Sequence, residues 1–188
     1  MMKDASVIDL TFPHSWSAEA LEKRPLIAPA RQFVYPKEAE EVEHGAMELL
    51  VKPAQGNVFL ATCALGFADP AAPTGIWSCP HPDWLCAVSG GYAYLIDTLE
   101  PQRWSMIPYR PVLQVRALRE QQLLLFVGHH SILAWGREGQ AWQSERLSWE
   151  GIEITSITSS TLIGTGWDLI TDKDVAFAID LRTGERQS

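Results

Sequence analysis

The sequence predicts an all-β protein made of three to four antiparallel, blade-like sheets that follow an extended N-terminal arm. Two observations lead to this fold class. From Ala46 to the C-terminus, short apolar runs with a period of two alternate with turn-forming residues, which is typical of half-buried strands. The outline of one hairpin also recurs further along the chain at a fixed spacing. Few segments after residue 46 show helical periodicity together with good helix formers, so strands are expected throughout this part.

The repeated hairpin is the strongest signal. Its first copy, LCAVSGGYAYLID, begins at Leu85, and the second, LLFVGHHSILAWG, begins 39 residues later at Leu124 with no gap. A third copy consists of LIGTGW, a seven-residue insertion (DLITDKD) and VAFAIDLRTGE. A further strand-like run precedes each copy, and another follows each of the first two. Sets of four short antiparallel strands every 40 to 45 residues, roughly, are the period of a propeller blade.

These repeats define units at about residues 76–110, 111–150 and 151–188, and the runs AMELLVK and NVFLATCAL predict a hairpin in a partial unit at 46–75. Together they predict a single all-β domain over 46–188. Because closed propellers usually need about four blades or more, three arrangements stay open: a small four-bladed ring, an open barrel or sandwich, and a larger ring completed by a second chain. An exposed blade edge favours pairing with another copy, so we expect a homodimer.

The end of the third hairpin resembles the quinoprotein-type (PQQ-like) propeller repeat, whose inner hairpin ends in an A-x-D-x-x-T-G-E turn. AFAIDLRTGE, which spans Ala176 to Glu185, matches it, with Asp180 at the acidic position. YLIDTLEPQRW is similar but replaces Thr-Gly with Glu100-Pro101, and ILAWGREGQAW lacks the aspartate. In such a turn the aspartate caps the backbone, the glycine takes positive φ and a following aromatic packs between sheets. The resemblance implies propeller-like sheets only; it implies no quinone chemistry, and no cofactor is expected.

Residues 1–45 predict an N-terminal arm packed on the body. Four prolines interrupt it: Pro13, Pro25, Pro29 and Pro36. They limit the arm to short helical pieces such as Ser17 to Lys23. The acidic run Lys37 to His44 is expected to be a solvated connector or a short helix.

Composition excludes several classes of partner. The chain has 188 residues, 23 acidic against 15 basic, for a net charge of −8, and no stripe of Lys and Arg that could neutralise successive phosphates. Nucleic acid and membranes are therefore not expected partners. The first residues lack the pattern of a signal peptide, and three cysteines without framework spacing (Cys63, Cys79 and Cys86) fit a reducing compartment. We expect a cytoplasmic protein.

The adjacent histidines of the second copy, His129 and His130, are candidate ligand-binding residues at a predicted tight turn. They replace Gly90 and Gly91 of the first copy, which favours a turn with a permissive backbone over a metal site. A weaker alternative adds His81 as a third metal ligand, although its CPHPDWLC segment lacks zinc-knuckle spacing.

Three of the eight tryptophans neighbour loops and polar residues, and these are candidates for lining a groove: Trp84, Trp149 and Trp167. Asp168 follows Trp167 at the hairpin that departs from the repeat, which is where function is favoured. Most of the other tryptophans are expected to fill the space between sheets.

The sequence favours a non-enzymatic interaction or scaffold module that binds a protein partner through blade edges and loops. A second hypothesis is a binder of small molecules or carbohydrates that uses loop tryptophans. A third, weaker one is a metal-dependent hydrolase or lyase using His81, His129 and His130.

Overall fold

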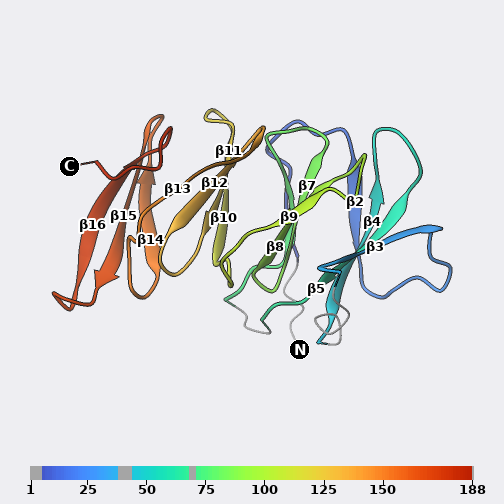
Figure 1. The fold of residues 1–188 in the computed structure, drawn as a ribbon, viewed down its shortest axis with the longest axis horizontal. Helices are drawn as coiled ribbons and strands as arrows, with labels where there is room; N and C mark the ends of the chain where they lie inside the picture. The colour runs from blue at the N-terminus through green and yellow to red at the C-terminus, as the bar shows by residue number, and fades with distance from the viewer. Residues whose placement is uncertain (1–5, 38–43, 68–70, 188) are drawn as a thin grey trace. The chain divides into compact units, whose positions relative to one another are not determined.

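The computed structural model describes residues 6–37, 44–67 and 71–187, and strands are the regular elements of these residues (Figure 1). The predicted all-β fold class is confirmed, with four sheets of three to five strands. The chain forms two compact units, residues 1–111 and 112–188. This division differs from the predicted one, an arm at 1–45 followed by a single domain. None of the described residues belongs to a helix that is long and apolar enough to cross a membrane.

The first unit holds two sheets. One has the order β2 (Ser17–Leu21), β4 (Ala46–Lys52), β5 (Phe59–Ala64) and β3 (Arg31–Tyr35). The other has the order β1 (Val7–Asp9), β6 (Gly75–Ser78), β7 (Trp84–Ser89), β8 (Tyr92–Asp97) and β9 (Trp104–Met106). The predicted β4–β5 hairpin is confirmed. Neighbouring strands are antiparallel except where β3 joins β5 and β1 joins β6, which are parallel pairs.

The N-terminal residues form strands that complete these two sheets. The predicted helical piece at Ser17 to Lys23 is wrong, because Ser17–Leu21 is strand β2. Its alanines, Ala18 and Ala20, pack against the core while Ser17 and Glu19 are exposed, so a period of two decides the conformation. The prolines of this segment lie between strands, where their missing N–H groups break no sheet hydrogen bond. Of the predicted acidic connector, residues 38–43 lie outside the described residues.

Aromatic residues of both sheets meet in the core of the first unit. The ring of Tyr35 lies 5.4 Å from that of Trp104 and 6.4 Å from that of Tyr94. Each buried hydroxyl donates to a backbone carbonyl, Tyr35 to Pro101 at 2.8 Å and Tyr94 to Ala64 at 3.0 Å. The polar atoms of these large buried side chains are therefore satisfied.

The second unit also holds two sheets. One has the order β10 (Gln114–Leu118), β11 (Leu123–Val127), β12 (Ile132–Gly136) and β13 (Gly139–Gln143). The other has the order β14 (Ile152–Ile157), β15 (Thr161–Asp168) and β16 (Lys173–Asp180). A shared core contains Leu125, Trp142, Leu162 and Phe177.

The predicted repeat is present in the strand register. Leu85 pairs with Ile96 in the first hairpin, and Leu124 pairs with Trp135 at positions 39 higher in the second. The two turns nevertheless differ. Gly90 and Gly91 both have positive φ, at 55° and 78°, whereas the described non-glycine residues with positive φ are Gln122 and Asp172. The histidine pair does occupy the equivalent two-residue turn: Gly128 donates to Ser131, and these two residues lie 39 positions after the paired Ser89 and Tyr92. The backbone conformation differs, because neither histidine has the positive φ of the two glycines.

The turn chemistry expected after the hairpins is confirmed. An Asp180 carboxylate oxygen accepts from the backbone N–H groups of Arg182 and Thr183, at 2.7 and 3.3 Å, and Gly184 has φ of +74°. Asp97 plays the same part in the first hairpin, accepting from the backbone at residues 99 and 100. The aspartate therefore fixes the chain where it leaves the inner hairpin.

Candidate functional site

A pocket of about 340 Å³ lies in the second unit, beside the end of the β15–β16 hairpin. We call it the hairpin-end pocket. Its lining residues are Arg146, Leu147, Ser148, Trp149, Trp167, Asp168, Thr171, Val175 and Arg186. Three of the residues singled out in the sequence, Trp149, Trp167 and Asp168, thus meet in one hollow.

The insertion in the third copy builds one wall of this pocket. It lengthens both strands of the hairpin, so that β15 and β16 have eight residues each, against five or six for the strands of the first two hairpins. Leu169 and Ile170 stand at the tip with 56% and 88% of their surface exposed. The irregularity in the repeat thus carries two aliphatic side chains beyond the regular sheet.

Asp168 fixes the turn at this tip. Its Oδ2 accepts from the hydroxyl of Thr171 at 2.8 Å and from the Thr171 backbone N–H at 3.0 Å. These hydrogen bonds stabilise the charged form and lower the pKa of the Asp168 carboxyl from its ordinary value. The carboxylate is thus a structural acceptor that also adds a negative charge to the pocket wall.

The opposite wall is the segment that carries Trp149, and the histidine pair holds it in place. The backbone carbonyl of His130 accepts from Leu147 at 2.7 Å, and that of His129 accepts from Gly151 at 3.0 Å. His130 Nδ1 also lies 3.2 Å from the Ser148 carbonyl oxygen. His129 and His130 are exposed and do not line the pocket, so their contribution is to position the Trp149 segment.

The two walls are joined through Trp149 and Trp167. The Trp149 backbone N–H donates to the Trp167 carbonyl at 2.9 Å. Gly166, next in the chain, allows this approach, because a Cβ at that position would lie 2.3 Å from the Leu147 carbonyl oxygen. A glycine at position 166 is therefore required by a contact between the two segments.

Two arginines give the pocket positive charge. The guanidinium of Arg146 lies 4.3 Å from the centre of the Trp149 ring, a cation–π contact. Arg186 donates to the Ala176 carbonyl at 3.2 Å and lies 4.0 Å from a Glu145 carboxylate oxygen. With Trp149 43% exposed, the pocket offers aromatic surface, two guanidinium groups and a carboxylate to a bound group.

The remaining predicted site residues lie elsewhere. Trp84 is half-buried in β7 of the first unit, with its backbone paired to Asp97, and is not part of the pocket. His81 closes the turn before β7, where its carbonyl accepts from Trp84 and its Nδ1 accepts from the Asp83 backbone N–H. Among the described residues, no three or more of His, Cys, Asp and Glu gather so that they could hold a metal ion. The metal site suggested at His81, His129 and His130 gains no support from these residues.

Sequence reasoning missed several residues of the site. Arg146 and Arg186 gave no signal, because their approach to Trp149 and to the hairpin depends on tertiary packing. Leu169 and Ile170 did give one: they are adjacent aliphatic residues inside the insertion that breaks the repeat.

Other hollows are less suited to a site. A pocket of about 430 Å³ in the second unit is lined mainly by polar turn residues, among them Gln121, whose amide donates to the Ser159 carbonyl. A smaller one of about 190 Å³ in the first unit lies between β3 and Trp104. Neither contains a tryptophan pair. As expected, Trp16, Trp77 and Trp142 are buried in the cores.

Comparison with solved structures finds similarity to β-propeller proteins. The computationally designed Ika8 protein aligns with a TM-score of 0.41 and 11% identity, over 76% of this chain and 45% of that one. The N-terminal domain of Nup159 aligns with a TM-score of 0.39 and 12% identity, over 98% of this chain and 53% of that one. The chain spans about half the length of these solved chains.

No protein family and no curated protein matches the sequence. The finer resemblance to quinoprotein-type repeats therefore stays a prediction. At these TM-scores no further conclusion rests on the structural likeness, and the description of the sheets as blade-like rests on the strand pairing itself. In fold, the chain is an all-β protein with four blade-like sheets.

Proposed function

We propose that this chain is a non-enzymatic interaction module that binds a protein partner at the hairpin-end pocket. One observation carries the proposal: the exposed pair Leu169 and Ile170 lies directly beside a pocket lined by Trp149 and Trp167. Single exposed aliphatic residues are ordinary, but apolar groups gathered at one place mark interaction surfaces.

The residue types support a protein as the bound species. Tryptophan and arginine are the side chains most enriched where alanine substitution weakens protein interfaces. Arg146 stacked on Trp149 forms a planar surface that is already assembled before binding, which lowers the entropy lost on association. A fitting partner buries an apolar side chain against Trp149 and the hairpin tip, and places an acceptor near Arg146 or Arg186.

Quantitative affinity capture with matched baits tests the proposal. The baits are the wild-type chain, the double variant Trp149→Ala/Ile170→Ser, and the control Ile8→Ser, which removes an aliphatic side chain 63% exposed in the first unit. We expect a protein retained by wild type and control and lost from the double variant. Calorimetry with that purified protein should then show a loss of affinity of about a hundredfold or more, since two central contacts are removed. Equal retention by all three baits would refute the proposed site.

A second candidate is a small-molecule or carbohydrate binder, because two tryptophans line a concave pocket whose size lies at the lower end for ligand sites. Tryptophan fluorescence titrated with neutral and acidic monosaccharides tests it. A saturable change that Trp149→Ala and Trp167→Phe both weaken supports this candidate. Titrations that never saturate, together with a captured protein, leave the protein partner as the function.

A further inference from the structure

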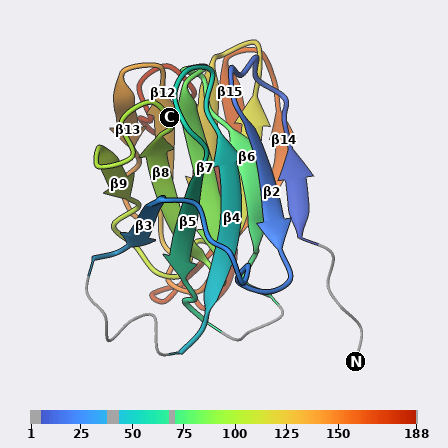
Figure 2. The same cartoon turned by 90° about the vertical axis from the view of Figure 1, so that its right-hand side faces the viewer.

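The connection between β2 and β3 crosses a face of its own sheet. These two strands are the opposite edges of the order β2-β4-β5-β3, so residues 22–30, here called the crossing loop, must pass over β4 and β5. Figure 2 looks onto this sheet and shows the connection running in front of both strands. One face of the sheet is therefore overlaid by chain.

The face that is crossed is the one turned away from the core. On β4, Met47, Leu49 and Val51 belong to the core cluster, so Glu48 between them points to the other face, which we call the outer face. Arg24 of the crossing loop makes its contacts there, with Glu48 at 3.4 Å and with Gln32 of β3 at 2.6 Å.

These contacts hold the crossing loop in a defined position. Glu48 is itself fixed, because Thr62 donates to its second carboxylate oxygen at 2.7 Å. Pro25 and Pro29 restrict the backbone further. The loop is therefore attached at Arg24 and stiffened on both sides of its centre.

The centre of the crossing loop presents Leu26 and Ile27 to solvent. Their exposed fractions are 106% and 91%, the highest among the large apolar residues described. Val34 lies on the outer face of β3 by the alternation of the strand, and 37% of its surface is also exposed. Two neighbouring aliphatic side chains held fully in water by an anchored loop form an apolar projection with nothing of its own unit to cover it.

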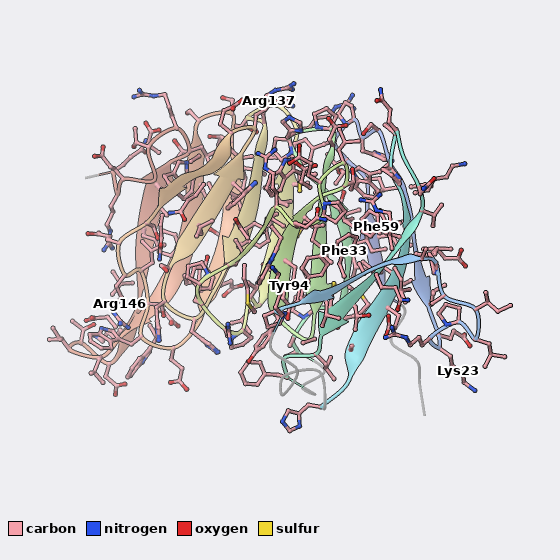
Figure 3. The ribbon with its side chains drawn as sticks, turned by 45° about the vertical axis from the view of Figure 1, so that its right-hand side comes forward. Lys23, Phe33, Phe59, Tyr94, Arg137 and Arg146 are labelled. Atoms are coloured by element: carbon pink, nitrogen blue, oxygen red, sulfur yellow. The ribbon has the colours of Figure 1, made fainter. Side chains whose placement is uncertain are left out.

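The charges around this projection are balanced. The outer face and crossing loop carry three acidic and three basic residues: Glu19, Glu22, Glu48, Lys23, Arg24 and Lys52. Figure 3 shows Lys23 extending from the loop. The chain as a whole has a net charge of −8, so this face lacks the excess negative charge that makes copies repel one another elsewhere. A face of mixed charge can meet an identical face with opposite charges opposed.

We propose that a second copy of this chain covers the outer face, in a two-fold dimer in which Leu26 and Ile27 of each copy pack against the crossing loop of the other. In such an isologous interface the same patch serves both partners, so each substitution acts twice. The anchored loop favours this association because little conformational freedom is lost when it forms. The proposal is independent of the hairpin-end pocket.

Sedimentation velocity over a wide range of concentration tests the dimer. For the wild type we expect the mass to rise from the 21.0 kDa of one chain to twice that value. The variant Leu26→Ser/Ile27→Ser should stay monomeric, and either single change should raise the dissociation constant by about tenfold or more. These side chains are exposed, so the variants should keep the wild-type circular dichroism and unfolding transition.

Matched controls separate this surface from others. Ile8→Ser and Ile170→Ser remove exposed aliphatic residues outside the outer face and should leave the dimer intact. Lys23→Glu makes both facing patches negative, so it should weaken the dimer at low salt, with recovery as salt screens the repulsion.

Three results would overturn the proposal: a wild type that stays monomeric at every concentration, a double variant that dimerises as well as wild type, or a dimer lost in Ile8→Ser instead. The alternative occupant, a lipid surface, has its own measurement. Co-sedimentation of monomeric wild type with neutral or anionic vesicles, abolished by Leu26→Ser/Ile27→Ser, would assign the projection to a membrane and refute the dimer. Ile170→Ser changes the hairpin tip beside the pocket and leaves Leu26 and Ile27 in place. Failure of the dimer proposal is therefore distinguishable from failure of the proposed protein-binding site.

Discussion

Gly166 lies against the carbonyl oxygen of Leu147 so closely that a Cβ on the glycine would be 2.3 Å from that oxygen. This contact joins the strand that carries Trp167 to the segment that carries Trp149. Because it is made by backbone on both sides, no larger residue at position 166 leaves the two walls of the hairpin-end pocket where they are.

Gly166→Ala should therefore displace the Trp149 segment and destabilise the protein. We expect a loss of about 1 to 3 kcal/mol in the free energy of unfolding, the usual cost of overpacking. Chemical denaturation measures it, and changed tryptophan fluorescence should report the displaced indole. Gly136→Ala is the control, because its Cβ would meet the nearest atom at 3.6 Å, an ordinary contact. Equal stability of the two variants would contradict this account of the pocket.

Gly184 supports the turn after β16 in a different way. It has φ of +74°, and a Cβ there would lie 2.5 Å from the Trp142 ring, whose indole N–H donates to Leu181 at 2.8 Å. Gly184→Ala combines backbone strain with overlap, so we expect a loss of about 2 to 4 kcal/mol. Gly151→Ala separates the two causes: its φ is +91° but nothing lies within 4 Å, so only the smaller backbone cost should remain. A larger loss of unfolding free energy in Gly151→Ala than in Gly184→Ala would contradict this explanation.

Asp168 should titrate below its ordinary pKa of 3.8 because Thr171 donates two hydrogen bonds to the carboxylate. Thr171→Val removes the hydroxyl and should raise the pKa of Asp168 toward 3.8, whereas Thr171→Ser should keep it low; an NMR titration of the side-chain carboxyl measures both. The folded-state pKa is lowered, so the contribution to stability is present above 3.8 and is lost as pH falls through the folded value. An unchanged pKa in Thr171→Val would show that the hydroxyl is not the cause.

The three thiols should be unreactive in the folded protein. Cys63, Cys79 and Cys86 are each fully buried, and burial raises the pKa of every one above its ordinary value of 9.0. A thiol reagent such as Ellman's should label none of them until denaturant is added. Because the folded pKa values are raised, the stabilising contribution is complete below pH 9.0 and falls as pH rises above it, which unfolding curves at increasing pH measure. Rapid labelling of one thiol under native conditions would contradict the burial.

Much of the fold could be predicted because local patterns carry it. The period of two placed the strands after residue 46, and the spacing of 39 between Leu85 and Leu124 located two hairpins in matching register. Asp180 and Gly184 predicted a turn in which the aspartate accepts backbone hydrogen bonds and the glycine has positive φ, and the structure has both. These features depend on neighbours in sequence, so the residues themselves specify them.

The N-terminal strands could not be predicted in the same way. Ser17–Leu21 and Arg31–Tyr35 are short and flanked by prolines, and they are strands because the edges of the β4–β5 hairpin offer hydrogen-bonding partners. The outer face and its crossing loop follow from that pairing, so the exposure of Leu26 and Ile27 had no counterpart in the sequence.

The sequence by itself determined the strand pattern, the repeat, the turn chemistry and three residues of the site: Trp149, Trp167 and Asp168. Only the tertiary structure decided that these three share a pocket with Arg146 and Arg186, and that His129 and His130 support the Trp149 segment without facing the pocket. The reason is physical: turns and alternation depend on adjacent residues, whereas a pocket depends on contacts between segments far apart in the chain, such as Gly166 against Leu147.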